Sequence, residues 1–221
     1  MRGVVIKDLR EVSRSAIRAR VAEVAEEMFV DNGFEATTVD AIAAAVGMSQ
    51  RTFFRYFASK DDLVLHNFEQ LGDNLTERLA ARPVAESDWT ALRRSFDVVT
   101  EQFADERQRA RGLMIQRIVD SSPSLLPGYL ERIARIQHRL STILRARRTH
   151  ETPSAPVDDA LVHALIGAAF ACLQAAVAES ARSTESRSHD LAARLDAIMS
   201  AIHPEPALPA VGTASPETSA G

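Results

Sequence analysis

Apolar residues recur at intervals of three and four along most of the 221-residue chain, which is the period of amphipathic helices. One apolar stripe runs from Ile17 to Phe29, and a second from Val64 to Leu79. No segment alternates apolar and polar residues in the manner of a half-buried strand. The pattern therefore predicts an all-α fold.

The stretch that follows the first stripe predicts two short helices. Thr37 and Asp40 have the spacing of a capping box, and Gly47 is placed to end the helix that they open. Ser49 is the expected cap of the second helix, residues 50–57. Two short helices joined by a turn that contains a glycine are typical of a helix-turn-helix motif.

A third capping pair, Ser59 and Asp62, predicts a long helix from Lys60 to about Arg82. At 1.5 Å per residue this helix would be roughly 30 Å long. It is long enough to connect the helix-turn-helix unit to a second body.

The second short helix is expected to present polar side chains to solvent, because Phe53 and Phe57 would turn inward. Gln and Arg have the donor geometry that reads base edges, and Thr, Tyr and Lys suit phosphate oxygens. The alternative to DNA binding is an ordinary packing of three helices, in which these polar residues only contact solvent.

The charge distribution supports a phosphate partner at one end of the chain. The net charge is −4, which is unusual for a protein that binds nucleic acid. Residues 1–20, however, hold six basic and two acidic residues, a net charge of +4, so the rest of the chain carries −8. We expect residues 1–13 to form a flexible basic arm.

The second half of the chain predicts a helical domain with a dimer interface. Residues 157–182 form the most apolar segment, and residues 188–202 form an amphipathic helix. A membrane span is the alternative for 157–182. It is disfavoured because eight of the nineteen residues from Ala160 to Ala178 are alanine and no second span exists. Pairing both helices with those of a second copy would give a homodimeric four-helix bundle.

The remaining features indicate a cytoplasmic protein with no membrane partner. The single cysteine, Cys172, excludes an intramolecular disulfide, and no secretion signal precedes the first helix. Residues 204–221 lack aromatic residues and apolar periodicity, so we expect a disordered tail.

Residues 33–64, GFEATTVDAIAAAVGMSQRTFFRYFASKDDLV, resemble the TetR family of transcription regulators. The resemblance implies a DNA-binding domain over residues 14–74, with its motif at 37–56, and an effector-binding and dimerisation domain over 75–203. The family is expected to act as a homodimeric repressor that a small, largely apolar effector releases from its operator. The implied DNA contacts are Thr38, Ser49, Gln50, Arg51, Thr52, Arg55, Tyr56 and Lys60.

Two positions depart from the family's pattern. Arg51 replaces a small residue and adds a potential base or phosphate contact. Phe54 replaces a common tyrosine, so one phosphate hydroxyl is lost.

The sequence RTFFRYF within the motif and the later segment SSPSLLPGYLERI also resemble a branch of the family that includes mycofactocin-type regulators. This resemblance implies an acyl-CoA-like or hydrophobic effector. Each candidate effector-binding residue could equally be part of the core. The candidates are Phe68, Phe96, Phe103, Met114, Arg117, Tyr129, Phe170 and Gln174.

Other function classes find less support. Asp159 and His163 stand four residues apart on a helix, but no third metal ligand accompanies them. Glycine-rich phosphate loops and nucleophile motifs are absent from the sequence. We therefore expect no enzymatic activity, no cofactor and no metal. The alternatives that remain are a helical adaptor and a DNA-binding regulator without a ligand switch.

Overall fold

The computed structural model describes residues 9–151, 156–182 and 190–203, and these residues form helices without any strand. This confirms the all-α prediction. The helices are α1 (Leu9–Asn32), α2 (Val39–Ala45), α3 (Gln50–Phe53), α4 (Lys60–Ala80), α5 (Asp88–Ser95), α6 (Asp97–Ala104), α7 (Glu106–Ser121), α8 (Leu126–Glu151), α9 (Asp159–Arg182) and α10 (Leu191–Ile202).

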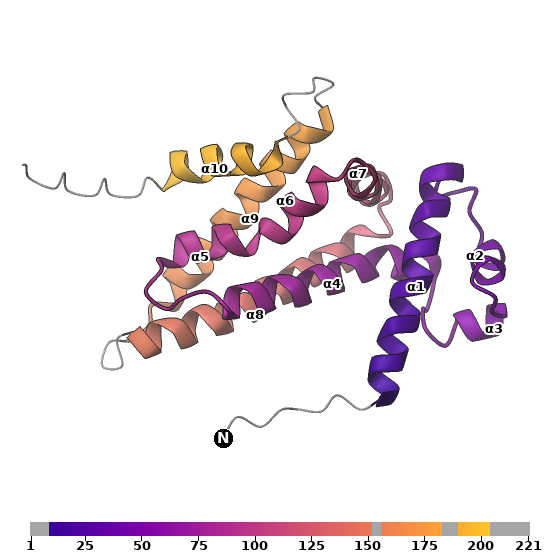
Figure 1. The fold of residues 1–221 in the computed structure, drawn as a ribbon, viewed down its shortest axis with the longest axis horizontal. Coiled ribbons are helices and arrows are strands. Elements are labelled where there is room, and N and C mark those ends of the chain that lie inside the picture. The colour runs from indigo at the N-terminus through magenta and orange to yellow at the C-terminus, as the bar shows by residue number, and fades with distance from the viewer. Residues whose placement is uncertain (1–8, 152–155, 183–189, 204–221) are drawn as a thin grey trace, which may run out of the picture.

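Helices α1, α2 and α3 lie together at one end of the molecule, and α9 and α10 lie toward the other (Figure 1). Buried apolar side chains form two clusters. The N-terminal cluster joins α1–α3 to the start of α4 and to α7, and includes Phe29, Phe53 and Phe57. The C-terminal cluster joins the rest of α4 to α5, α6, α8, α9 and α10.

Helix α1 begins earlier than the sequence suggested. It starts at Leu9, so residues 9–13 of the predicted flexible arm are helical, and that part of the prediction is wrong. The segment contains no Pro or Gly to stop the helix, and Leu9 and Val12 remain exposed. Residues 1–8 and the predicted disordered tail, 204–221, lie outside the described residues.

The turn between α2 and α3 follows the predicted glycine and serine signals, with two changes. Helix α3 ends at Phe53, short of the predicted residue 57. Gly47 has φ +73°, the left-handed conformation that ends a helix, and the Ser49 side chain caps α3. The cap of α2, however, is Thr38 rather than Thr37. The Thr37 hydroxyl is buried and donates a hydrogen bond of 2.8 Å to the carbonyl oxygen of Gly33.

Helix α4 connects the two clusters, as its predicted length suggested. Leu63 and Val64 belong to the N-terminal cluster, whereas Leu75 and Leu79 belong to the C-terminal cluster. Its N-terminus is capped by Ser59, whose hydroxyl accepts a hydrogen bond of 3.0 Å from the backbone N–H of Asp62.

Helix α8 runs beside α4 in the same direction (Figure 1), and two glycines permit the close approach. A Cβ on Gly72 of α4 would lie 2.8 Å from Cγ1 of Ile136, and a Cβ on Gly128 of α8 would lie 2.7 Å from Cδ1 of Leu65. The two glycines therefore allow α4 and α8 to pack closely at both points.

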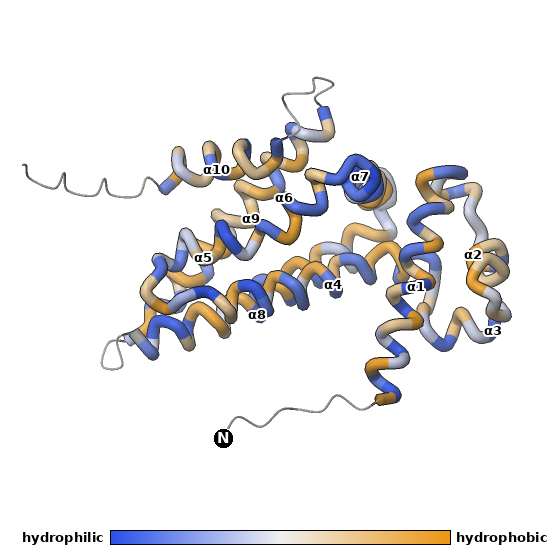
Figure 2. Tube along the Cα trace, viewed as in Figure 1, coloured by the Kyte–Doolittle hydropathy of each residue, from blue (hydrophilic) through white to orange (hydrophobic). Residues whose placement is uncertain are grey.

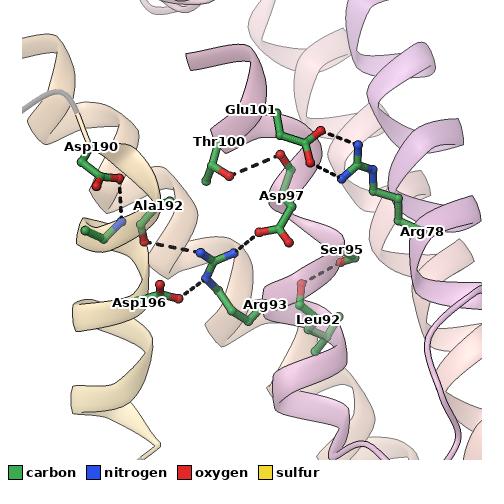
Figure 3. Close-up of polar contacts among 11 residues, drawn as sticks. Arg78, Leu92, Arg93, Ser95, Asp97, Thr100, Glu101, Asp190, Ala192 and Asp196 are labelled. Carbon is green, nitrogen blue, oxygen red and sulfur yellow. Dashed lines mark hydrogen bonds and ion pairs between the residues drawn. The ribbon is translucent and has the colours of Figure 1, made fainter. Parts of the chain in front are cut away.

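Helix α10 is fastened to α5 and α6 through the buried Arg93 (Figure 3). Its guanidinium group pairs with Asp97 at 2.6 Å and also with Asp196, and it donates to the carbonyl oxygen of Ala192 at 3.4 Å. The charge pairs fix the position of α10 against the rest of the C-terminal cluster.

Helix α9 buries one face and exposes another. Ile166, Phe170 and Leu173 are buried in the C-terminal cluster, whereas the small residues Gly167 and Ala171 are exposed. Figure 2 shows that hydrophobic residues occupy most of the helix. Among the described residues, α9 alone is long and apolar enough to cross a membrane by length and composition, and its buried face packs on α5, α8 and α10.

Candidate nucleic-acid interface

Three predicted base-reading side chains lie on the exposed side of the α2–α3 unit. Gln50 and Arg51 form the first turn of α3, and Arg55 follows its end. All three are exposed, and none has a side-chain hydrogen bond or ion pair among the described residues. Their donors are therefore available to an external ligand. Phe53, between them, is fully buried and holds α3 against the N-terminal cluster.

The hydroxyl groups of this region have structural roles in addition to any contact with DNA. Ser49 Oγ accepts a hydrogen bond of 3.1 Å from the backbone N–H of Thr52 and lies 2.9 Å from Thr52 Oγ1. Thr38 Oγ1 accepts a hydrogen bond of 3.1 Å from the backbone N–H of Ala41. These bonds set the start of α2 and α3, and the exposed Thr38 hydroxyl keeps its own proton to donate.

Lys60 is turned toward the protein. Its ammonium group donates to the carbonyl oxygens of Phe34 at 2.7 Å and of Thr37 at 3.1 Å, and it lies 4.1 Å from the centre of the Phe34 ring. Two of its three protons are therefore used within the fold. The phosphate contact predicted for Lys60 stays a prediction, with one N–H left for it.

Two aromatic residues frame the other end of α3. The Tyr56 ring packs against the N-terminal cluster and is half-buried. Phe54 is 50% exposed, and its ring lies nearly perpendicular to the Phe53 ring at a centroid distance of 5.6 Å. An aromatic ring this exposed beside the reading residues can contact a thymine methyl group.

Two arginines of α1 lie beside this surface and were not among the predicted contacts. Arg10 and Arg14 line the same groove as Arg55 and Tyr56, and Arg14 donates to the carbonyl oxygen of Arg55 at 3.5 Å. Their spacing of four residues, followed by Ile17, is the sequence signal that could have placed them on one face of α1.

Charged groups join α1 to α7 next to the DNA-binding unit. Glu26 of α1 is only 3% exposed, and its carboxylate lies 3.4 Å from the guanidinium group of Arg111 in α7. Burial raises the pKa of Glu26 to about 7, and the attraction of Arg111 and a hydrogen bond from Asn67 lower it only in part. The carboxylate of Glu27, also on α1, lies 2.8 Å from the guanidinium group of Arg107 on α7.

A second charged group joins α1, α4 and α8. Glu69 of α4 accepts a hydrogen bond of 3.1 Å from the ring of His66, and Arg18 of α1 and Arg132 of α8 lie at 3.4 and 3.7 Å from its carboxylate. The hydrogen bond with His66 holds the pKa of Glu69 below its usual value, despite partial burial. The two groups together connect the DNA-binding unit to three helices of the remaining fold.

The predicted effector residues do not gather in one place. Phe96, Phe103 and Phe170 belong to the C-terminal cluster, whereas Met114, Phe68 and Tyr129 belong to or pack on the N-terminal cluster. This division does not test their role, so the effector-binding assignment stays a prediction. Helical period identifies inward faces but not which of two cores a face meets.

Two of these residues still form a link between α8 and α9. The Tyr129 ring meets the Phe68 ring at a centroid distance of 5.0 Å, and its hydroxyl accepts a hydrogen bond of 3.3 Å from Gln174. Arg117 is exposed, and its side chain donates to the carbonyl oxygen of Leu113 at 3.3 Å.

The pair that raised the alternative of a metal site has other contacts. The Asp159 carboxylate binds Arg145 at 2.7 Å, and a ring nitrogen of His163 lies 2.7 Å from the backbone oxygen of Asp159. Within the described part of the chain, no group of three His, Cys, Asp or Glu side chains is arranged to hold a metal ion.

Residues 21–66 match the family described as "Bacterial regulatory proteins, tetR family". The chain is 34% identical over 143 residues to the HTH-type transcriptional regulator TcmR of Streptomyces glaucescens, and the match covers 63% of each chain. It is 30% identical over 136 residues to the putative mycofactocin biosynthesis transcriptional regulator MftR of Mycobacterium tuberculosis, covering 58% of this chain and 67% of that one. The chain thus spans less than two thirds of the length of TcmR.

Among solved structures, Thermus thermophilus FadR, a TetR family transcriptional repressor in complex with lauroyl-CoA, has the same fold. The TM-score is 0.59 at 23% sequence identity, and the match covers 88% of this chain and 99% of FadR. The matched segment contains α2, α3 and the start of α4, the elements that carry the residues predicted to read bases. The chain belongs to the TetR family of bacterial regulatory proteins.

Proposed function

We propose that the protein is a sequence-specific DNA-binding transcription regulator that acts as a homodimeric repressor in the cytoplasm. One observation carries the proposal: Gln50, Arg51 and Arg55 are exposed around α3, and their side chains have no partner among the described residues. Buried Phe53 keeps α3 fixed while these side chains face outward. A recognition helix in the major groove needs this arrangement.

The proposed DNA contacts are of two kinds: some read base edges, and others position the protein on the phosphate backbone. Gln50 and Arg51, at the first turn of α3, would read base edges, because Arg pairs with guanine and Gln with adenine through two hydrogen bonds each. Thr38 and Tyr56 would bind phosphate oxygens on either side. Ser49 and Thr52 would act chiefly by holding α3 in place.

The homodimer is proposed to form through α9 and α10. Gly167, Ala171 and Ala175 recur every four residues on the exposed face of α9, so a second copy of the helix could approach closely. Two reading helices on one dimer would meet half-sites about one helical turn of DNA apart.

The ligand switch is proposed to act through α4. This helix starts beside the reading unit and ends in the C-terminal cluster, so a shift of its far end changes the separation of the two reading helices. The coupling would be about 1–3 kcal/mol. The lauroyl-CoA in the T. thermophilus FadR complex supports an acyl-CoA or a similar, largely apolar molecule as the effector class.

A gel shift with the DNA upstream of the protein's own gene tests DNA binding. We expect a complex that weakens steeply with salt and that is weakened by Arg51→Ala and by Tyr56→Ala. Unchanged binding in both variants would reject the assignment of α3 as the reading element. A thermal-shift panel of lauroyl-CoA, other acyl-CoAs and hydrophobic carboxylates tests the switch, and no shift with any of them would favour a regulator without an effector.

A further inference from the structure

A cavity of about 530 Å³ lies at the end of the C-terminal cluster that is remote from the helix-turn-helix unit, and we call it the distal cavity. This volume is within the range of small-molecule sites. The start of α5, the end of α8, the first turns of α9 and the residue after α10 line it. Figure 1 shows these helix ends at the opposite side of the molecule from α1–α3. None of the candidate effector residues lines the distal cavity, so it differs from the effector site that the sequence predicted.

Both acidic side chains that line the distal cavity in the described part of the chain are already paired with arginines. The two carboxylate oxygens of Glu86 accept hydrogen bonds of 2.6 and 2.7 Å from Arg82. Asp88 accepts a hydrogen bond of 2.5 Å from Arg148, and its other oxygen lies 3.6 Å from the guanidinium group of Arg147. Three guanidinium groups therefore accompany two carboxylates, a net charge of +1. This charge favours an anionic ligand over a cationic one.

Arg148 is the arginine that is placed to bind an anion in the distal cavity. Its Nε atom donates to Asp88, whereas Nη1 and Nη2 donate no hydrogen bond to a described residue. The pairing with Asp88 orients the guanidinium group, and 27% of the side chain is exposed. Arg147, in contrast, donates to three backbone carbonyl oxygens between α4 and α5. A planar guanidinium group with both Nη atoms available matches the two oxygens of a carboxylate.

Aromatic rings form another part of the cavity wall. Trp89 stacks on His203, with ring centroids 5.4 Å apart and planes 27° apart. The Trp89 ring is 6% exposed and belongs to the C-terminal cluster, whereas His203 is exposed. The aliphatic side chains of Val157 and Leu165 also line the distal cavity. A flat aromatic ring suits this wall, because stacked rings attract each other beyond the burial of apolar surface.

We propose that the distal cavity binds a planar aromatic carboxylate, with its carboxylate group on Arg148 and its ring against Trp89 and His203. A monoanion matches the net charge of the paired groups, whereas a phosphate dianion would exceed it. The inference is independent of the proposed DNA binding and adds a second ligand class to the proposed acyl-CoA-like effector. Since the distal cavity joins α5, α8, α9 and α10, the bound ligand should also raise the thermal stability of the protein.

The test uses the full chain with 4-nitrobenzoate as the probe and 4-nitrobenzylamine as its cationic counterpart of similar shape. Trp89 is the only tryptophan of the chain, so quenching of tryptophan fluorescence by the nitro compounds reports on this cavity directly. Isothermal titration calorimetry gives the dissociation constants. We expect saturable quenching by 4-nitrobenzoate with a dissociation constant below about 1 mM, and binding of the amine that is weaker by about tenfold or more. By calorimetry, benzoate should bind more tightly than cyclohexanecarboxylate, which lacks the aromatic ring.

Substitutions at Arg148 test where the carboxylate binds. Arg148→Gln should weaken the binding of 4-nitrobenzoate by about 10- to 100-fold, because it removes a charged pair of hydrogen bonds. Arg148→Lys keeps the charge and should weaken binding less, and it decides the matter if the Gln variant does not fold. Arg145→Gln is the matched control, since Arg145 lies on the same helix, pairs with Asp159 at 2.7 Å and does not line the cavity. Circular dichroism and thermal unfolding without ligand check the fold of each variant.

Four results would overturn the inference. The first is the absence of saturable quenching by 4-nitrobenzoate up to about 10 mM. The second is tighter binding of 4-nitrobenzylamine, which would reverse the assigned charge of the ligand. The third is wild-type affinity in both Arg148 variants, and the fourth is a heat of binding without quenching of Trp89; each would place the ligand elsewhere. None of these results bears on the proposed DNA-binding function, which is tested separately.

Discussion

Glu26 should make the stability of the folded protein depend on pH near neutrality. Burial raises its pKa from 4.5 to about 7, so between these values the folded state holds a proton that the unfolded state has released. The stabilisation is therefore complete below about pH 4.5 and is lost as the pH rises through about 7. At about 1.4 kcal/mol per pH unit, the free energy of unfolding should fall by about 3 kcal/mol over this window.

Glu26→Gln keeps the shape and the hydrogen-bonding capacity of the side chain but removes its titration. Urea unfolding of the wild type and this variant, at about pH 5 and about pH 8 and at one protein concentration, gives the difference that belongs to Glu26. We expect the wild type to lose about 2–3 kcal/mol more than the variant between the two conditions. Glu27→Gln is the control, because its side chain is 36% exposed and also pairs with α7.

An equal pH dependence in the wild type and Glu26→Gln would refute this reasoning. It would mean that the attraction of Arg111, at 3.4 Å, offsets the loss of hydration and keeps the carboxylate charged. Greater stability of the wild type at the higher pH, relative to the variant, would reverse the sign and would make the pair a stabilising salt bridge.

Three further substitutions test contacts that hold the helices of the fold together. Gly72→Ala should lower the free energy of unfolding, measured in urea, by about 1–3 kcal/mol, because the added Cβ would lie 2.8 Å from Ile136. An unchanged urea midpoint would contradict the close packing of α4 and α8. Arg93→Ala should lower it by about 2–4 kcal/mol, since a buried charge and its two aspartate pairs are lost. Lys60→Met should lower thermal stability by about 1–3 kcal/mol through two lost hydrogen bonds, and full stability with lost DNA binding would instead make Lys60 a phosphate contact.

The sequence predicted the helix-turn-helix fold well because its signals are local. A glycine at +73° and the serine caps act within a few residues, so the motif specifies its own turn. The main error, Thr37 in place of Thr38 as the cap of α2, arose where two threonines are adjacent. Tertiary contact decided between them, because the Thr37 hydroxyl turns inward to the carbonyl oxygen of Gly33.

The groove and the effector residues could not be predicted in the same way, because they depend on how distant helices meet. Arg10 and Arg55 are far apart in the sequence and share a groove only after α1 packs against the segment that follows α3. Phe68 and Phe96 both lie on apolar faces, yet they contact different cores. Burial of Glu26 likewise requires α7, which hydrophobic period alone does not place against α1.

The central claim, that α3 reads DNA sequence, is tested most directly by selection from a randomised duplex pool with the wild type and with Arg51→Ala. We expect the wild type to enrich a sequence with two related half-sites, and Arg51→Ala to relax the preference at one base position in each half-site, at about 1–3 kcal/mol per position. Identical enriched sequences for both proteins, or no enrichment by the wild type, would contradict the claim.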